Sequence, residues 1–247
     1  SESDGGYRSQ PVSNYAGLYT LVVKGDATDS THVPGGDGFG LVSIDTNGVI
    51  KLSGSKLADG QLFAQTVRVS SSGEWPLYSR ADSAGTGQYN SFIMGWLTVS
   101  QSAGISGSNI MWIKAATGPT QYAGLSMDTT VEGSPYFPSD PLTTNVVSWT
   151  NGLVTYEGAG IPAGVLSNSV TLLTTSGKNK FTTDKVNKMS LGLTPKTGKI
   201  TVGLEYPLGT KFAGEGAIVT NTLGGSGYLK LKDGATNSFY MWLHSNP

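Results

Sequence analysis

The chain has 247 residues, of which 37% are hydrophobic and 13% charged, with 35 glycines and no cysteine. The absence of cysteine excludes disulfide bonds, thiolate catalysis and cysteine metal sites. A net charge of −1 with scattered basic residues is unlike the basic stripe of a nucleic-acid-binding protein, and no run approaches the ~18 apolar residues of a membrane helix.

Short strands separated by turns are predicted along the whole chain. Residues 1–13 are polar and are expected to be a flexible lead-in. In the first half, strands are predicted at residues 18–23, 39–44, 49–53, 62–69, 75–80, 92–99 and 110–114. In the second half they are predicted at residues 170–174, 188–193, 199–205, 211–220, 228–232 and 239–244. No stretch has a sustained helical period with caps, so the predicted class is all-β.

The two halves share sequence. Residues 41–52 match 191–202, residues 60–64 match 209–213, and the segment 90–97 returns as 237–243, one glycine shorter. Self-similarity at a long period indicates one structural unit used twice. We therefore expect two duplicated antiparallel meander units, forming two small barrels or sandwiches or one pseudo-symmetric barrel.

The unit boundaries follow from these matches and from the prolines. The prediction is a flexible segment at 1–13, a first β unit at 14–116, a linker or crossover at 117–148 and a second β unit at 149–247. Prolines at 135, 138 and 141 place the linker, because proline lacks the backbone donor that a ladder needs. Trp96 and Trp242 lie at the same position of the repeated segment. Because the residue is the same in both copies, the sequence predicts structurally equivalent, buried side chains on matching strands.

Several ordered motifs resemble a known type of module. They lie at residues 15–21, 35–40, 57–60, 73–78, 95–97, 188–198 and 214–219. Together they resemble a duplicated β-module at the C-terminal end of large secreted bacterial proteins built from repeats. The resemblance implies a secreted or cell-surface location and an accessory role, and it brings no catalytic residues.

Four aromatic side chains are candidates for ligand binding. Trp96 and Trp242 are assigned to the core, which leaves Trp75, Tyr78, Trp149 and Tyr156 as candidates for a surface that stacks on a sugar ring. The competing interpretation places them in the core beside solvated neighbours, since adjacent strand residues point to opposite faces.

Catalytic chemistry is the alternative. A glycosidase uses two carboxylates on either side of the scissile bond, and the glutamates available are Glu74, Glu132, Glu157, Glu205 and Glu215. A hydrolytic triad needs a histidine held by a carboxylate, and only His32 and His244 exist. No serine-hydrolase elbow accompanies them, so no catalytic residue is assigned.

Three aspartates gather in the first long loop. Asp26, Asp29 and Asp37 could supply oxygen ligands to calcium, the one cofactor considered. Their spacing matches no compact calcium motif, and aspartate often caps its own turns. The sequence favours a loop ordered by turns and packing.

The expected function is a non-catalytic structural or adhesion module of a larger secreted protein, with a glycan or a protein surface as partner. Carbohydrate binding is one form of this role. A glycan-active enzyme that uses a carboxylate pair is the alternative from another class.

Overall fold

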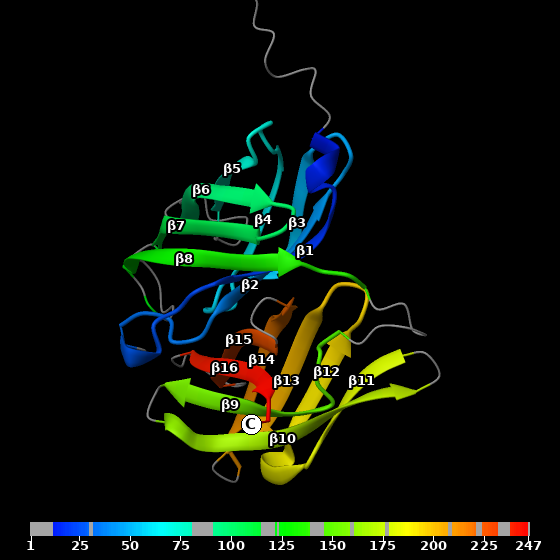
Figure 1. Ribbon diagram of the computed structural model, residues 1–247. Coiled ribbons are helices and arrows are strands. Elements are labelled where there is room, and N and C mark those ends of the chain that lie inside the picture. The colour runs from blue at the N-terminus through cyan, green and yellow to red at the C-terminus, as the bar shows by residue number, and fades with distance from the viewer. Residues whose placement is uncertain are drawn as a thin grey trace, which may run out of the picture.

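The computed structural model describes residues 12–29, 32–80, 91–114, 122, 124–138, 146–158, 161–175, 178–206, 209–220, 224–231 and 238–246. Within these residues the chain forms two eight-stranded antiparallel sheets, one above the other (Figure 1). Each sheet is nearly closed into a barrel. The all-β prediction with two duplicated barrel units is therefore confirmed.

The first barrel contains η1 (Val12–Tyr15), β1 (Gly17–Val23), η2 (Ala27–Asp29), β2 (Gly38–Ile44), β3 (Val49–Lys56), β4 (Leu62–Arg68), β5 (Glu74–Arg80), β6 (Phe92–Ser100), β7 (Gly104–Ile113) and β8 (Ser126–Pro135). The strand order is β4-β3-β2-β1-β8-β7-β6-β5, so the first strand pairs with the last. A seam remains between β4 and β5, which pack together without a backbone ladder.

The second barrel contains β9 (Asn151–Gly158), β10 (Ile161–Thr175), β11 (Lys178–Thr183), η3 (Val186–Lys188), β12 (Ser190–Thr194), β13 (Lys199–Glu205), β14 (Lys211–Val219), β15 (Gly224–Leu231) and β16 (Phe239–Ser245). Its order is β11-β10-β9-β16-β15-β14-β13-β12. Again the first strand pairs with the last, and the seam lies between β11 and β12.

Side chains fill both barrels. Alternation along each strand turns one set of residues inward, as in β5, where Trp75 and Leu77 are buried while Glu74 and Tyr78 are exposed. The largest fully buried side chains of the first barrel include Trp75, Trp112, Phe39 and Phe63. Each interior is therefore a packed core, which matches the size expected for an eight-stranded barrel.

The predicted linker needs a correction. Residues 117–148 were assigned to a linker or crossover, yet residues 126–135 form β8, which pairs with both β1 and β7. The strand alternates as a half-buried strand should, with Thr129 and Val131 buried and their neighbours exposed. The prolines that suggested a linker begin only at its last residue, Pro135.

The repeated segments do not occupy the same ordinal strands. Residues 41–52 lie on β2 and β3, the second and third strands of the first barrel, whereas their match at 191–202 lies on β12 and β13, the fourth and fifth of the second. Trp96 lies on β6 and Trp242 on β16. Both side chains point outward, with exposed fractions of 66% and 38%, so the prediction of buried side chains on matching strands is wrong.

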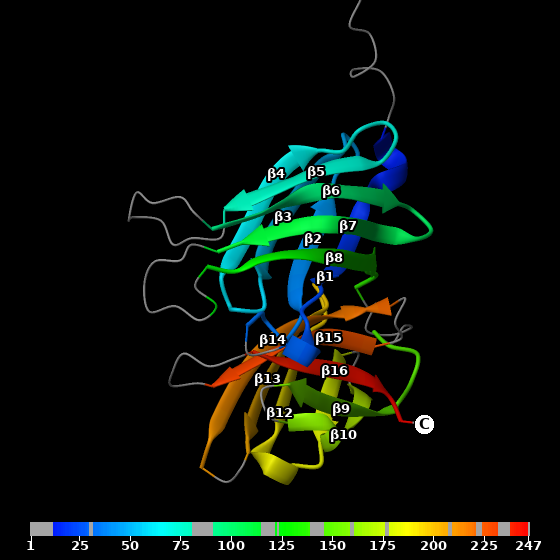
Figure 2. The same ribbon diagram turned by 90° about the vertical axis from the view of Figure 1, so that its left-hand side faces the viewer.

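The outer face of β14 and β15 packs against β1 and β2, and this contact is called the barrel junction here (Figure 2). The segment before β2 enters it: the Gly36 amide donates to Ser238 Oγ (3.2 Å) and the Asp37 amide to the Gly227 carbonyl (3.1 Å). A Cβ on Gly36 would lie 2.4 Å from the Phe239 carbonyl oxygen, so this approach requires glycine.

Candidate functional site

The four aromatic candidates separate into core and surface. Trp75 is fully buried and donates through Nε1 to Gln65 Oε1 (2.9 Å), and Tyr156 is 1% exposed. Burial raises the pKa of Tyr156. Trp149 is half-buried and stacks on Phe181 with ring centroids 6.0 Å apart. Of the four, Tyr78 alone is mostly exposed, at 54%.

Tyr78 belongs to a larger apolar surface, which we call the β5–β7 face. Its members project from the outside of three neighbouring strands: Pro76, Tyr78, Phe92, Met94, Trp96 and Met111. Strand register builds it, because Tyr78 lies opposite Met94, and Met94 lies opposite Met111. The Tyr78 and Phe92 rings are 6.3 Å apart.

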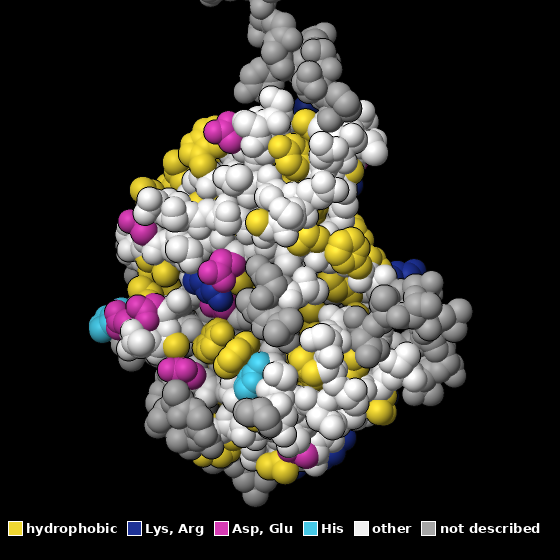
Figure 3. Space-filling view, in the orientation of Figure 1, with side chains coloured by type: hydrophobic (Ala, Val, Ile, Leu, Met, Phe, Trp, Pro, Cys, Tyr) yellow, Lys and Arg dark blue, Asp and Glu magenta, His cyan; other side chains and the backbone are white. Residues whose placement is uncertain are grey.

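The β5–β7 face is exposed to solvent. Figure 2 shows β5, β6 and β7 side by side toward the viewer, and Figure 3 shows hydrophobic side chains along the upper left flank that these strands form. Exposed fractions are 66% for Trp96, 41% for Met94 and 39% for Met111. A contiguous group of exposed apolar side chains is typical of an interaction surface.

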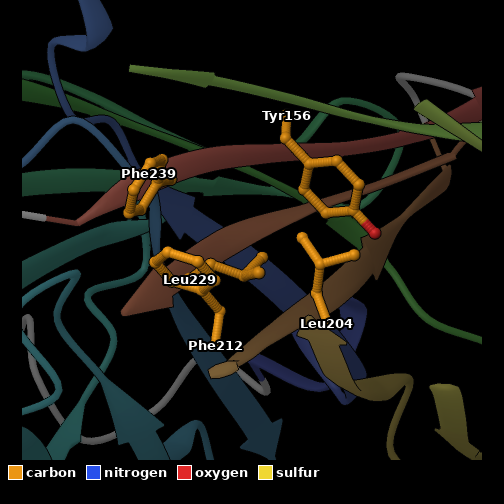
Figure 4. A pocket seen from close by; sticks show the side chains of 5 residues that line it. All are labelled: Tyr156, Leu204, Phe212, Leu229 and Phe239. Carbon is orange, nitrogen blue, oxygen red and sulfur yellow. The ribbon is translucent and has the colours of Figure 1, made fainter. Parts of the chain in front are cut away.

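The second barrel contains a small apolar pocket (Figure 4). It is lined by Tyr156, Leu204, Phe212, Leu229 and Phe239, and its empty space is about 180 Å³ with open solvent included. Ligand pockets usually measure about 300–1,000 Å³. This pocket is therefore too small for a ligand of ordinary size.

The three loop aspartates have separate roles. Asp26 accepts from the amide of Thr28 (2.9 Å) and from its hydroxyl (2.6 Å), and Asp29 pairs with His32 Nδ1 (2.6 Å). Asp37 points into the barrel junction. Within the described part of the chain, no three His, Asp or Glu side chains gather as metal ligands.

The glutamates are also distributed. Glu205 pairs with Lys188 (2.8 Å), Glu215 lies between Lys56 (2.7 Å) and Lys199 (2.9 Å), and Glu74 accepts from Ser72. Glu132 contacts Lys24 (3.6 Å) and Glu157 lies opposite Tyr240. Of the five, Glu132 lies against Lys24 of the first barrel and Glu157 against Tyr240 of the second, and Lys24 and Tyr240 belong to one group of ionisable side chains.

That group of charges surrounds Asp37, which is 2% exposed. Its carboxylate accepts from the Ser226 hydroxyl, the Gly25 amide (3.0 Å) and Lys24 Nζ (3.4 Å). Burial raises the pKa of Asp37 above its ordinary value, and the Lys24 ammonium opposes this shift. Burial works to lower the pKa of Lys24, but Asp37, Tyr240 and Glu132 hold it above its ordinary value. The cluster joins β1 and β8 to β15 and β16, so its first effect is to hold the barrels together.

Beside this cluster, Trp242 stacks on His244 with ring centroids 4.0 Å apart. A histidine next to exposed hydrophobic side chains over β16 is visible in Figure 3. His244 Nδ1 lies 2.8 Å from the Ser245 carbonyl, so its partner among the described residues is a backbone oxygen and not the carboxylate that a hydrolytic triad needs.

Sequence reasoning missed most of the β5–β7 face. Trp96, Met94, Met111 and Phe92 were not among the predicted ligand-binding residues. Their signal is the alternation along 92–98, in which Ile93 and Leu97 are buried while Met94 and Trp96 are exposed. The register shift between Met94 and Thr98 places its extra residue on β7, so it does not disturb this alternation on β6.

Comparison of the chain with models of protein families, with curated proteins and with solved structures finds no match. The described residues contain no helix long and apolar enough to span a membrane.

Proposed function

We propose that this protein is a non-catalytic adhesion module that attaches a larger secreted protein to a partner protein through the β5–β7 face. The observation that carries the proposal is the row of Tyr78, Met94 and Met111 in register, flanked by Phe92 and Trp96. Aromatic residues and methionine are enriched where protein interfaces are fully buried.

The chemistry of the face favours a protein partner over a glycan. Tyrosine and tryptophan are frequent binding hot spots, and flexible methionines adapt to irregular apolar surfaces. Two methionines lie at the centre of the face, where a sugar platform would need hydrogen-bonding groups beside its rings. The secreted location rests on the resemblance to a secreted module.

The test is binding of the full chain to a panel of purified extracellular-matrix proteins by surface plasmon resonance, with a glycan array in parallel. The variant Tyr78→Ala/Trp96→Ala should weaken protein binding at least about tenfold, the cost of losing one or two hot spots. Phe137→Ala is the matched control, since this side chain is 77% exposed outside the face.

Saturable protein binding that the double variant loses and the control keeps supports the proposal. If the wild type instead binds a glycan saturably and the double variant does not, the partner of the face is a glycan and not a protein. Equal binding by the wild type and the double variant refutes the role of the face.

The alternative of a glycan-active enzyme has one specific basis: Glu132 contacts Lys24, and Glu157 lies opposite Tyr240, which also interacts with Lys24. Turnover of any polysaccharide that disappears in both Glu132→Gln and Glu157→Gln would establish it and overturn the non-catalytic role.

A further inference from the structure

Four lysines gather at the edge of the barrel junction, and we call them the lysine cluster: Lys56, Lys114, Lys199 and Lys230. Two carboxylates accompany them. Lys114 pairs with Asp59 (2.8 Å), with side-chain exposures of 5% and 0%, and Glu215 binds Lys56 and Lys199. The described part of this cluster therefore has two more positive than negative charges, although the whole chain has a net charge of −1.

The unbalanced charge is concentrated at Lys230. Its ammonium donates to the backbone carbonyl of Asp59 (2.7 Å), a neutral acceptor, while both carboxylates are bonded to other lysines. Burial lowers the pKa of Lys230; the Asp59 carboxylate opposes this shift, and the Lys114 and Lys56 ammonium groups add to it. An ammonium has three donors, so Lys230 retains capacity for an anionic acceptor.

The hydroxyl of Tyr228 lies beside this ammonium. The Cβ position at Gly60 would be 2.8 Å from Lys230 Nζ and 3.7 Å from the Tyr228 hydroxyl, so both polar groups flank one point of the β3–β4 turn. Gly60 has φ +85°, a conformation that suits glycine, and because it carries no Cβ the Lys230 ammonium approaches this turn closely. Lys230 is half-buried, so solvent and small ions reach it.

We propose that the lysine cluster binds a small oxyanion, held by Lys230 and Tyr228 of the second barrel and approached by Lys56 of the first. The ligand is phosphate or sulfate, free or as the anionic group of a larger molecule. Lysine binds such groups as a point charge, and an anion here relieves the repulsion among the cations. Because the donors come from both barrels, the bound anion strengthens the junction.

The test uses the full chain with sodium sulfate and sodium phosphate, titrated calorimetrically at constant ionic strength set with sodium chloride. We expect saturable binding and a melting temperature that rises with anion concentration, as required when a ligand binds only the folded state. N-acetylglucosamine 6-sulfate is titrated in the same way as a third ligand. Tighter binding than inorganic sulfate indicates a larger natural ligand, and equal binding indicates a free ion.

Lys230→Met should weaken anion binding at least about tenfold, which is the loss of ~1.4 kcal/mol. Lys180→Met is the matched control, because Lys180 is exposed on β11 and its loss changes the net charge equally. Tyr228→Phe keeps the buried ring and removes only the hydroxyl, so a weakened affinity with an unchanged far-UV spectrum supports the site independently of folding.

The proposal is overturned if sulfate and phosphate act no differently from chloride, or if Lys180→Met weakens binding as much as Lys230→Met. It does not depend on the β5–β7 face, whose variants should bind the anion like the wild type.

Discussion

The seam between β4 and β5 offers the sharpest test of how the first barrel stays closed. No backbone ladder joins these strands. Instead, Ser79 Oγ accepts from the Ala64 amide (2.9 Å) and donates to the Ala64 carbonyl (3.0 Å). Gln65 Nε2 adds a bond to the Pro76 carbonyl (2.8 Å). Side chains therefore replace the missing backbone pairing.

Ser79→Ala removes both bonds to Ala64 with little change in volume. A neutral hydrogen bond contributes about 1 kcal/mol to stability, so the loss of two should cost about 2 kcal/mol. For a chain of this size 1 kcal/mol corresponds to about 2–4 °C, so the melting temperature should fall by about 4–8 °C.

Chemical denaturation gives the change in unfolding free energy, and hydrogen exchange at the Ala64 amide locates it. Ser72→Ala is the control, because Ser72 is exposed and its hydroxyl bonds only to surface groups. Its effect should stay within about 0.5 kcal/mol. If both variants are equally stable, or if Ala64 exchanges at the wild-type rate in Ser79→Ala, the seam is not held by this hydroxyl.

Four further predictions concern the core, the barrel junction, where there are two, and the first loop. Trp75→Ala should cost about 3–5 kcal/mol because it opens a cavity in the core, whereas Trp96→Ala should change stability by under about 0.5 kcal/mol; guanidinium unfolding distinguishes them. The pKa of Asp37 is higher in the folded than in the unfolded state, so the folded state favours the protonated carboxyl. The stabilisation from this difference is complete at pH values below the unfolded-state pKa and is lost as pH rises through the folded-state pKa. Asp37→Asn should therefore gain stability relative to the wild type as pH rises from 3 to 7, and an unchanged difference would contradict this. Burial raises the pKa of Glu215, but the hydrogen bonds and charges of Lys56 and Lys199 outweigh it, so the pKa is below its ordinary value. The stabilisation that Glu215 gives to the folded state is therefore lost as pH falls through its folded pKa. Glu215→Gln should make the free energy of unfolding less dependent on pH in the acid range. Calcium and chelator should leave the melting temperature unchanged, and a calcium-dependent rise would show a site in the 26–38 loop.

The strand pattern made the fold class predictable, but the number of strands was not. Seven strands were expected in the first half and six in the second, whereas each sheet has eight. β8 was missed because its inward positions include Thr129 and Gly133, which give a weak hydrophobic signal. β9 was missed because it follows closely on prolines, although Leu153 and Thr155 alternate with buried Val154 and Tyr156.

The binding surface was harder to predict than the fold. Alternation correctly separates Glu74 from Trp75, but it does not say which of the two faces the core. The repeated tryptophan at positions 96 and 242 suggested a buried position. In the structure both tryptophans point outward, and the leucine that follows each, Leu97 or Leu243, points into the barrel. The glycines of segment 35–40 indicate close packing against another part of the chain. Only the structure shows that this part is β15.

The pairing of first and last strands determines how each barrel responds to a pulling force. Tyr19 lies opposite Pro135 and Gly152 opposite Ser245, so the chain enters and leaves each barrel at the same end of one strand pair. Tension applied through the backbone therefore peels β1 from β8, or β9 from β16, one hydrogen bond at a time. A barrel with this topology yields gradually under load instead of rupturing all hydrogen bonds of a strand pair together.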